Sequence, residues 1–420
     1  MSEWSKKRIN QLGRVVTGKT PPKDEPHYFD GEELFISPKD LDWDQLYVNE
    51  TGTRVSVKAL EKFRNQVIPK NSVLFTSLSF GFGKMGISSR PSLTNQQINS
   101  VVVNSDNDFH FVYYLLQACT QFIFAYNSGI DTPIVPKSVF ERIELRCPQY
   151  SEQRKIAAVL WAYDELIENN KRRIALLERL AEEIYREWFV RFRFPGHETT
   201  KVIKGIPCGW EVRALGSFAN EIKRGVRKKD LPDDEKYIGL EHIPRRSISI
   251  KNWATADTIE SNKLTFQNRD ILFGKIRPYL HKVCLAHFSG ACSSDTIIIR
   301  PKEKFYEGYL LFTVFSDTFI DLATIASKGT KMPRADWGFL KKLELAVPSK
   351  DLLENYQTQF DAVFCQIVNL LQTNDRLTSS RDLLLPRLIS AKLSVEQLDI
   401  KFPPGMGQEL NADSPISTNA

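Results

Sequence analysis

Residues 151–190 read SEQRKIAAVLWAYDELIENNKRRIALLERLAEEIYREWFV. Ser151 and Glu152 offer an N-terminal cap, and no glycine or proline follows until Pro195, so the stretch predicts one long helix. Its apolar positions recur at alternating spacings of four and three, which is typical of a coiled-coil seam. The seam positions are Ile156, Leu160, Tyr163, Ile167, Asn170, Ile174, Leu177, Ala181, Ile184 and Trp188.

A second stretch carries the same seam, weakened by Arg381 and Pro386. Its positions are Tyr356, Phe360, Val363, Ile367, Leu370, Asn374, Leu377, Leu384 and Leu388. Asn170 and Asn374 occupy equivalent positions, where a polar residue fixes register at a cost in stability. Each helix could instead pack only on its own globule. We favour helix-on-helix pairing, because the seam is longer than one small globule can cover. Each helix would be roughly 50–60 Å long at 1.5 Å per residue, which makes it a spacer.

The chain upstream of each helix repeats once. Trp4 before Leu12 matches Trp210 before Leu215. The other matching segments are residues 72–75 with 270–273, 129–133 with 329–333, and 145–148 with 345–348. Each copy combines short β-rich runs with an apolar helical segment. These helical segments are predicted around residues 111–126 and 309–326.

The predicted fold class is α+β, with two tandem pseudo-repeated globules, two long antiparallel coiled-coil helices and approximate two-fold symmetry. The predicted boundaries are residues 1–150 for the first globule, 151–195 for the first spacer helix, 205–350 for the second globule, 351–398 for the second spacer helix, and 403–420 for a disordered tail. Antiparallel helices would hold two reading heads a fixed distance apart, which suits a bipartite site on duplex DNA.

Composition permits DNA binding but does not demand it. The 420 residues carry 57 Lys and Arg against 51 Asp and Glu, for a net charge of +6 and a pI of about 8.8; many proteins of other function carry as much. The six cysteines form no C-x-x-C pair, so a structural zinc site is not expected. Because neither a signal sequence nor a membrane span is found, we expect a cytoplasmic protein with reduced thiols and no membrane contact.

Two motif matches are rejected. Residues 13–20 (GRVVTGKT) fit the P-loop pattern, but Pro21 and Pro22 follow at once and oppose the helix that holds phosphate. Residues 81–86 (GFGKMG) fit the dinucleotide fingerprint, but residues 87–91 are a poor helix start. The sequence contains no N-P-P-[FY] motif, and its histidines lack metal-ligand or triad spacing. We therefore expect no catalytic or metal-binding residues in this chain.

Polar and basic loops at matching places in both copies are the candidate DNA contacts. Lysine and arginine would contact phosphates, whereas arginine, amide and hydroxyl side chains read base edges, and Asn95, Gln96 and Gln97 suit adenine. The candidates in the first copy are Lys19, Thr20, Lys39, Lys84, Gln96, Gln97 and Thr132. Those in the second are Arg224, Lys228, Lys229, Lys275, Arg277, Tyr279, Lys328, Thr330 and Lys331. A single such run is usually a solvated loop; recurrence in both copies favours DNA.

Residues 187–196 (EWFVRFRFPG) and 205–210 (GIPCGW) resemble the central conserved region of type I restriction-modification specificity subunits. Pro148 with Glu152 and Gln153, and residues 384–390 (LLPRLIS), are similar too, and the resemblance covers Trp4 to about Leu398. Ala391 departs from the family, which often has glycine there.

The resemblance implies a non-catalytic subunit whose two target-recognition domains bind the halves of an asymmetric bipartite site in double-stranded DNA. It implies that the helices set the gap between the halves and recruit two methyltransferase subunits, which use S-adenosylmethionine. Motor-nuclease subunits that use ATP and Mg would join these, and no cofactor is expected in this chain.

Three alternatives remain open at this point. An enzyme with a nucleotide site at residues 13–20 would bind ATP tightly. A coiled-coil scaffold would bind partners without any sequence preference for DNA. A methylation-only system would lack the motor-nuclease subunit.

Overall fold

The computed structural model describes residues 4–41, 46–78, 81–128, 133–327 and 332–407, and it divides into two compact units. The first unit comprises residues 1–168 with 376–420, and the second comprises residues 169–375. Both divisions fall inside long helices, α6 (Tyr150–Tyr185) and α10 (Lys350–Ile389). Each unit therefore contains part of both helices, and each is described by itself below.

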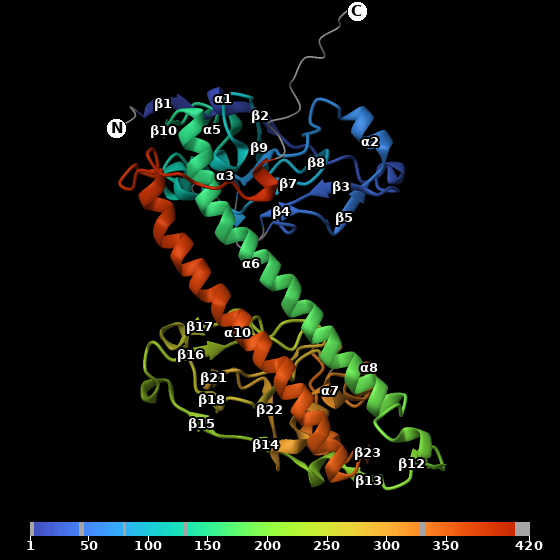
Figure 1. The fold of residues 1–420 in the computed structure, drawn as a ribbon. Helices are drawn as coiled ribbons and strands as arrows, with labels where there is room; N and C mark the ends of the chain where they lie inside the picture. The colour runs from blue at the N-terminus through green and yellow to red at the C-terminus, as the bar shows by residue number, and fades with distance from the viewer. Residues whose placement is uncertain (1–3, 42–45, 79–80, 129–132, 328–331, 408–420) are drawn as a thin grey trace, which may run out of the picture. The chain divides into compact units, whose positions relative to one another are not determined.

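The first unit is built on a five-stranded sheet with the order β2-β9-β6-β7-β4 (Figure 1). Its strands are β2 (Gly13–Thr17), β4 (Tyr47–Val48), β6 (Val73–Thr76), β7 (Met85–Ser88) and β9 (Ile98–Val103). Alternate side chains of β6 enter different cores, since successive residues of a strand point to opposite faces. Val73 and Phe75 join the cluster that includes helix α3 (Phe109–Ala118), and Leu74 joins the cluster that includes β3 (Glu33–Ile36).

Smaller elements complete the first unit. A three-stranded sheet has the order β5-β3-β8, and β1 pairs with β10. The remaining elements are β1 (Ser5–Arg8), β5 (Thr53–Val55), β8 (Ser92–Thr94), β10 (Glu144–Cys147), α1 (Ile9–Leu12), α2 (Val57–Lys62), α4 (Thr120–Phe124), α5 (Lys137–Phe140) and α11 (Pro404–Gly407). The predicted disordered tail thus begins with a helical turn, in which Met406 is buried; residues 408–420 lie outside the described residues.

The second unit is built on a four-stranded sheet with the order β14-β22-β19-β20 and a five-stranded sheet with the order β15-β18-β21-β16-β17. The strands are β14 (Ala219–Ile222), β15 (Gly225–Val226), β16 (Lys236–Ile238), β17 (Ala254–Thr255), β18 (Lys263–Phe266), β19 (Ile271–Gly274), β20 (Val283–Leu285), β21 (Gly290–Cys292) and β22 (Thr296–Pro301). Two pairs lie outside these sheets, β11 (Val202–Ile203) with β12 (Ile206–Pro207), and β13 (Glu211–Ala214) with β23 (Glu344–Val347). The helices are α7 (Glu307–Phe315), α8 (Asp317–Ile325) and α9 (Trp337–Leu340).

The same pairings occur in both units. β2 pairs with β9 and β9 with β6, as β14 pairs with β22 and β22 with β19. The parallel pair β3 and β8 has a counterpart in β16 and β21. Each helical segment predicted as one helix is two helices. In the second unit the break is at Ser316, whose hydroxyl caps α8 by accepting from the Phe319 N–H at 3.2 Å.

The two long helices run antiparallel in both units (Figure 1). In the second unit Asn170 donates to Asn374 at 2.8 Å, and the rings of Trp188 and Tyr356 lie 5.7 Å apart. In the first unit Asp164 pairs with Arg381. The seam positions from Ile156 to Leu177 and from Phe360 to Leu377 are all buried or half-buried.

Arg381, which the sequence marks as a weak point of the seam, is accommodated by pairing. Its side chain is buried, and the guanidinium binds the carboxylate of Asp164, which also accepts from the Tyr114 hydroxyl. A buried charge is tolerated when it is paired and hydrogen-bonded in this way. Pro386 lies on the exposed side of α10, and Ala391 ends the helix in the left-handed conformation with φ 59°, where glycine is favoured.

Within the described ranges no single helix is long and apolar enough to cross a membrane. The bent pair formed by residues 304–315 and 317–325 reaches that length and composition only when both helices are taken together.

Candidate nucleic-acid interface

In the first unit, the loops that follow two parallel strands meet at one end of the smaller sheet. β3 and β8 pair with Ile36 opposite Thr94, so the chain leaves both strands at the same end. The Asn95 N–H donates to the Ile36 carbonyl at 2.9 Å, which extends the pairing by one residue. The Asn95 side chain then accepts from the Gln97 N–H at 2.9 Å, a bond that is typical of turns. The register of the sheet therefore fixes the position of the side-chain amides of residues 95–97 at this end of the β3–β8 pair.

Gly18 brings a third segment to this point. A Cβ at position 18 would lie 2.2 Å from the carbonyl oxygens of Thr94 and Asn95, so only glycine lets the chain pass so closely. The next residues are thereby set beside the loop, and the Thr20 hydroxyl donates to Oε1 of Gln96 at 2.8 Å. Gly18 of the P-loop-like match thus allows its backbone to pass close to the backbone of Thr94 and Asn95.

A groove of about 630 Å³ lies beside these loops, and four of the predicted contacts line it. They are Thr20, Lys39, Gln96 and Gln97. The loop that carries Lys39 is held by Asp40, which accepts from the N–H groups of Ser37 at 2.9 Å and Gly52 at 2.8 Å.

The groove also has apolar walls that sequence reasoning missed. Phe29, Phe35 and Pro38 line it. No signal distinguishes them in the sequence, because phenylalanines in or beside a strand are equally expected in a core.

Two other predicted contacts of the first unit lie outside the groove lining. Lys19 is exposed, with its ammonium 5.5 Å from the centroid of the Phe63 ring. Lys84 is half-buried and donates to the Leu41 carbonyl at 3.0 Å, so its ammonium stabilises a loop of its own unit. Thr132 lies outside the described residues.

In the second unit, residues 275–279 form a loop that pairs with residues 333–335. Arg277 donates its N–H to the Pro333 carbonyl at 2.8 Å, and Ala335 donates to the Lys275 carbonyl at 2.9 Å. Arg277 and Tyr279 are exposed, and Lys275 is half-buried. The loop therefore presents a guanidinium and an aromatic ring to solvent. Lys328, Thr330 and Lys331, predicted beside it, lie outside the described residues.

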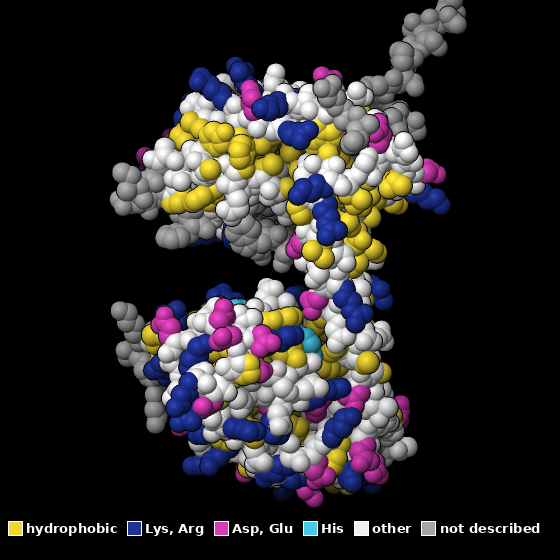
Figure 2. Space-filling model, turned by 90° about the vertical axis from the view of Figure 1, so that its left-hand side faces the viewer, with side chains coloured by type: hydrophobic (Ala, Val, Ile, Leu, Met, Phe, Trp, Pro, Cys, Tyr) yellow, Lys and Arg dark blue, Asp and Glu magenta, His cyan; other side chains and the backbone are white. Residues whose placement is uncertain are grey.

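The basic run of the second unit differs from residue to residue. Arg224 and Lys229 are exposed. Lys228 donates to the Ala256 carbonyl and lies 3.6 Å from a carboxylate oxygen of Asp233. Figure 2 shows Lys and Arg side chains interspersed with Asp and Glu on the visible face of this unit. Phosphate contacts on that face would depend on individual loops, because no broad basic patch covers its described residues.

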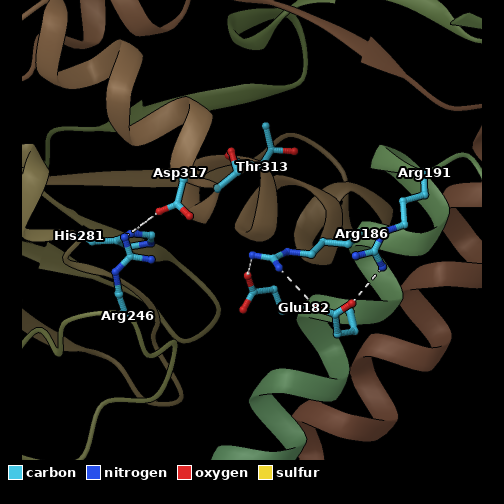
Figure 3. A network of polar contacts seen from close by, with 9 residues as sticks. Glu182, Arg186, Arg191, Arg246, His281, Thr313 and Asp317 are labelled. Atoms are coloured by element: carbon cyan, nitrogen blue, oxygen red, sulfur yellow. Dashed lines mark hydrogen bonds and ion pairs between the residues drawn. The ribbon is translucent and has the colours of Figure 1, made fainter.

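A second polar cavity, of about 360 Å³, lies between α6 and the sheets and helices of the second unit. Figure 3 shows Arg246 and His281 close together beside Asp317, with oxygen-to-nitrogen distances of 2.8 and 3.5 Å. Arg186 of the turn after α6 binds Glu182 at 2.6 Å in the same view. Burial and the nearby Arg246 lower the pKa of His281, so its ring is neutral at pH 7. The Ser247 hydroxyl, which also lines this cavity, donates to Glu178 of α6 at 2.9 Å and so joins the helix to the rest of its unit.

Both rejected motifs overlap strands. Residues 13–17 of the first match form β2, and the last two residues of the second match, Met85 and Gly86, begin β7. Neither segment leads into the helix that a phosphate cradle requires. In the described part of the chain, no group of three or more His, Cys, Asp and Glu is arranged to hold a metal ion. Burial raises the pKa of Cys147 to about 11 and that of Cys292 to about 12, so both thiols stay protonated.

Comparisons with known proteins point to one family. Residues 1–179 match the model of the type I restriction modification DNA specificity domain. The chain is 27% identical over 420 residues to the type I restriction enzyme MjaIX specificity subunit of Methanocaldococcus jannaschii, covering 94% of this chain and 95% of that protein. It is 26% identical over 304 residues to the EcoDI specificity subunit of Escherichia coli, covering 64% of this chain and 67% of that protein.

A solved structure shares the fold. The S subunit of a type I restriction-modification system from M. genitalium superposes with a TM-score of 0.55 at 15% identity, over 92% of this chain and 96% of that one. The chain is thus similar in sequence to type I restriction enzyme specificity subunits, with residues 1–179 matching the family's DNA specificity domain, and similar in fold to an S subunit.

Proposed function

We propose that the chain is the DNA-sequence specificity subunit of a type I restriction-modification complex, and that each globule reads one half of an asymmetric bipartite site. The observation that carries this proposal is the recurrence of one set of strand pairings in two units whose exposed loops differ in chemistry. Two globules of similar fold that expose different side chains are suited to bind two half-sites of different sequence.

The long helices would act as the spacer between the half-sites. In this proposal α6 and α10 form one antiparallel coiled coil with approximate two-fold symmetry, and its length sets the unspecified gap. The Asn170–Asn374 bond in the second unit and the Asp164–Arg381 pair in the first support one consistent register. The globules are proposed as residues 1–150 and 205–350, and the spacer helices as 151–195 and 351–398.

The partners would be double-stranded DNA, two methyltransferase subunits and motor-nuclease subunits. S-adenosylmethionine, ATP and Mg would act in those subunits, and this chain would contribute no catalytic group; the complex would work in the cytoplasm. Leu176 and Leu180 of α6 are 63% and 48% exposed and lie one turn apart, so they offer an apolar contact to a partner. The names of the relatives, which are restriction enzyme specificity subunits, support this assembly.

Methylation of a random DNA library in vitro tests the proposal. With the methyltransferase subunit and S-adenosylmethionine present, adenine methylation at a gapped motif is expected only when this chain is added. If the same motif is methylated without the chain, or if methylation shows no sequence preference when the chain is present, the proposal fails and the coiled-coil scaffold becomes the better interpretation.

Docking of the methyltransferase is tested separately. The double variant Leu176→Glu and Leu180→Glu should reduce co-purification of the methyltransferase subunit, because it puts charge on the apolar contact. Val57→Glu, on an equally exposed apolar residue of α2, is the matched control and should have no effect. If the double leucine variant and Val57→Glu co-purify the same amount of methyltransferase subunit, Leu176 and Leu180 are not part of the contact.

A further inference from the structure

We propose that the groove of the first unit reads an A·T base pair, with the Gln96 amide on the adenine edge and Thr20 as the residue that positions this amide. The inference rests on the proposed function, since it names the base pair that one of the two readers selects.

The amide of Gln96 matches adenine in the major groove. Adenine offers an N6–H donor beside the N7 acceptor, and a primary amide offers an acceptor oxygen beside an N–H donor. Oε1 of Gln96 accepts one bond from Thr20 at 2.8 Å and keeps its second lone pair for a base. Guanine offers two acceptors, N7 and O6, at the same positions. Its O6 would therefore face the amide oxygen, and two lone pairs would repel each other.

Thr20 holds the amide of Gln96 in place. The last torsion of a glutamine is broad and roughly two-fold, so a free side chain exchanges its oxygen and nitrogen positions readily. The Thr20 hydroxyl donates to Oε1 and thereby restrains this torsion; in a turned-over amide, Nε2 would donate to the same hydroxyl instead. The bidentate contact with adenine uses the lone pair of Oε1 that lies on the Nε2 side, which leaves the other for Thr20. The bond to Thr20 is therefore compatible with the adenine contact and limits the freedom that the side chain loses on binding.

The apolar walls suit the other base of the pair. Thymine carries a methyl group in the major groove, which is recognised by apolar contact. Phe29 is half-buried and lines the groove together with Phe35 and Pro38, on the same cavity as Gln96. An amide beside aromatic and proline side chains can therefore select both partners of one A·T pair.

The charges of the groove agree with this assignment. The cations among its described lining residues are Lys23 and Lys39, and arginine, the commonest reader of guanine, is absent from that lining. Compact ammonium groups suit the phosphates on either side of a base pair. The exposed loop of the second unit differs, because it presents Arg277.

The test is methylome sequencing of hosts that express the methyltransferase with the wild-type chain or with variants. Gln96→Ala should lower the preference at one A·T position of one half-site by about tenfold or more, and leave the gap and the other half-site unchanged. Thr20→Val should weaken the same position, and Thr20→Ser, which keeps the hydroxyl, should restore it. Gln121→Ala changes an exposed glutamine of α4 outside the groove and should leave the motif intact.

The outcomes separate the inference from the function on which it rests. A gapped motif that Gln96→Ala leaves unchanged, or relaxes at a G·C position, overturns the inference while the proposed function stands. Equal effects of Thr20→Val and Thr20→Ser would remove Thr20 as the positioning residue. A wild-type chain that yields no gapped motif would refute the proposed function itself, and the inference with it.

Discussion

Neighbouring lysines of the second unit have different surroundings. Lys228 already binds the Ala256 carbonyl, whereas Lys229 and nearby Arg224 are exposed. A side chain can bind a DNA phosphate readily when its cation is exposed and is not already bound to a group of its own protein. Lys229 and Arg224 therefore suit phosphates better than Lys228, a distinction that the sequence alone cannot make.

We predict that replacing Lys228 and Lys229 with alanine weakens binding at all DNA sequences and flattens the dependence of log Kd on log salt. The slope should fall by about 0.9 for each phosphate that the variant no longer neutralises, because fewer counterions are released. The single variants should show that Lys229 carries more of this effect than Lys228. A slope unchanged in the double variant would remove both residues from the backbone contacts.

Histidines of the second unit should make its stability depend on pH. Burial lowers the pKa of His281 and His242, and burial together with Lys236 lowers that of His287 to about 4. The unfolded chain takes up these protons near pH 6.5, before the folded chain does. The stability is therefore complete above pH 6.5 and is lost as the pH falls from 6.5 toward 4.

The corresponding measurement is the thermal midpoint between pH 7.5 and 5. The thermal midpoint should fall as the pH is lowered. In His287→Gln this decline should be shallower, by an amount that corresponds to about 2 kcal/mol of unfolding free energy at pH 5. A decline of the same steepness in this variant would show that His287 is not its source.

At the scale of elements, α6 and α10 are joined in the first unit by a buried ion pair. Asp164 and Arg381 are 6% and 8% exposed, and Tyr114 of α3 adds a hydrogen bond to the same carboxylate. Removing one partner leaves an uncompensated buried charge, which costs far more than breaking an exposed pair.

Asp164→Ala should accordingly lower the free energy of unfolding by about 3 kcal/mol. The double variant Asp164→Leu with Arg381→Met should cost less than the single one, since no unpaired charge remains. Breaking the exposed pair of Arg8 and Glu144 with Glu144→Ala, in the same unit, should cost under about 1 kcal/mol. Urea unfolding measures all three, and a double variant less stable than Asp164→Ala would contradict this account.

These elements also show what sequence can and cannot reveal. The spacing of apolar residues predicts both long helices and their seam positions, because burial of one helical stripe leaves a local signature. The same spacing marks Arg381 as a weak point of the seam and cannot show how its charge is paired, because its partner lies 217 residues away and no local pattern reveals it. The same limit applies to the groove: its amides are distinctive in the sequence, and its phenylalanines are not.

At the scale of the whole molecule, the internal repeat predicts which strands correspond, as β6 and β19 show. It cannot predict that the compact units divide inside the helices, between residues 168 and 169 and between 375 and 376. That division depends on which globule each half of a helix packs against, which is a property of tertiary contacts.

Methylome sequencing of a chain from which residues 165–171 and 373–379 are deleted tests whether the long helices set the gap between the half-sites. The matched deletions remove one heptad from each helix and keep Asp164 opposite Arg381. Seven residues span about 10 Å, or about three base pairs at 3.4 Å each. If the helices are the spacer, both half-sites should persist with a gap shorter by about three base pairs. Altered half-sites with an unaltered gap would contradict this role of the helices.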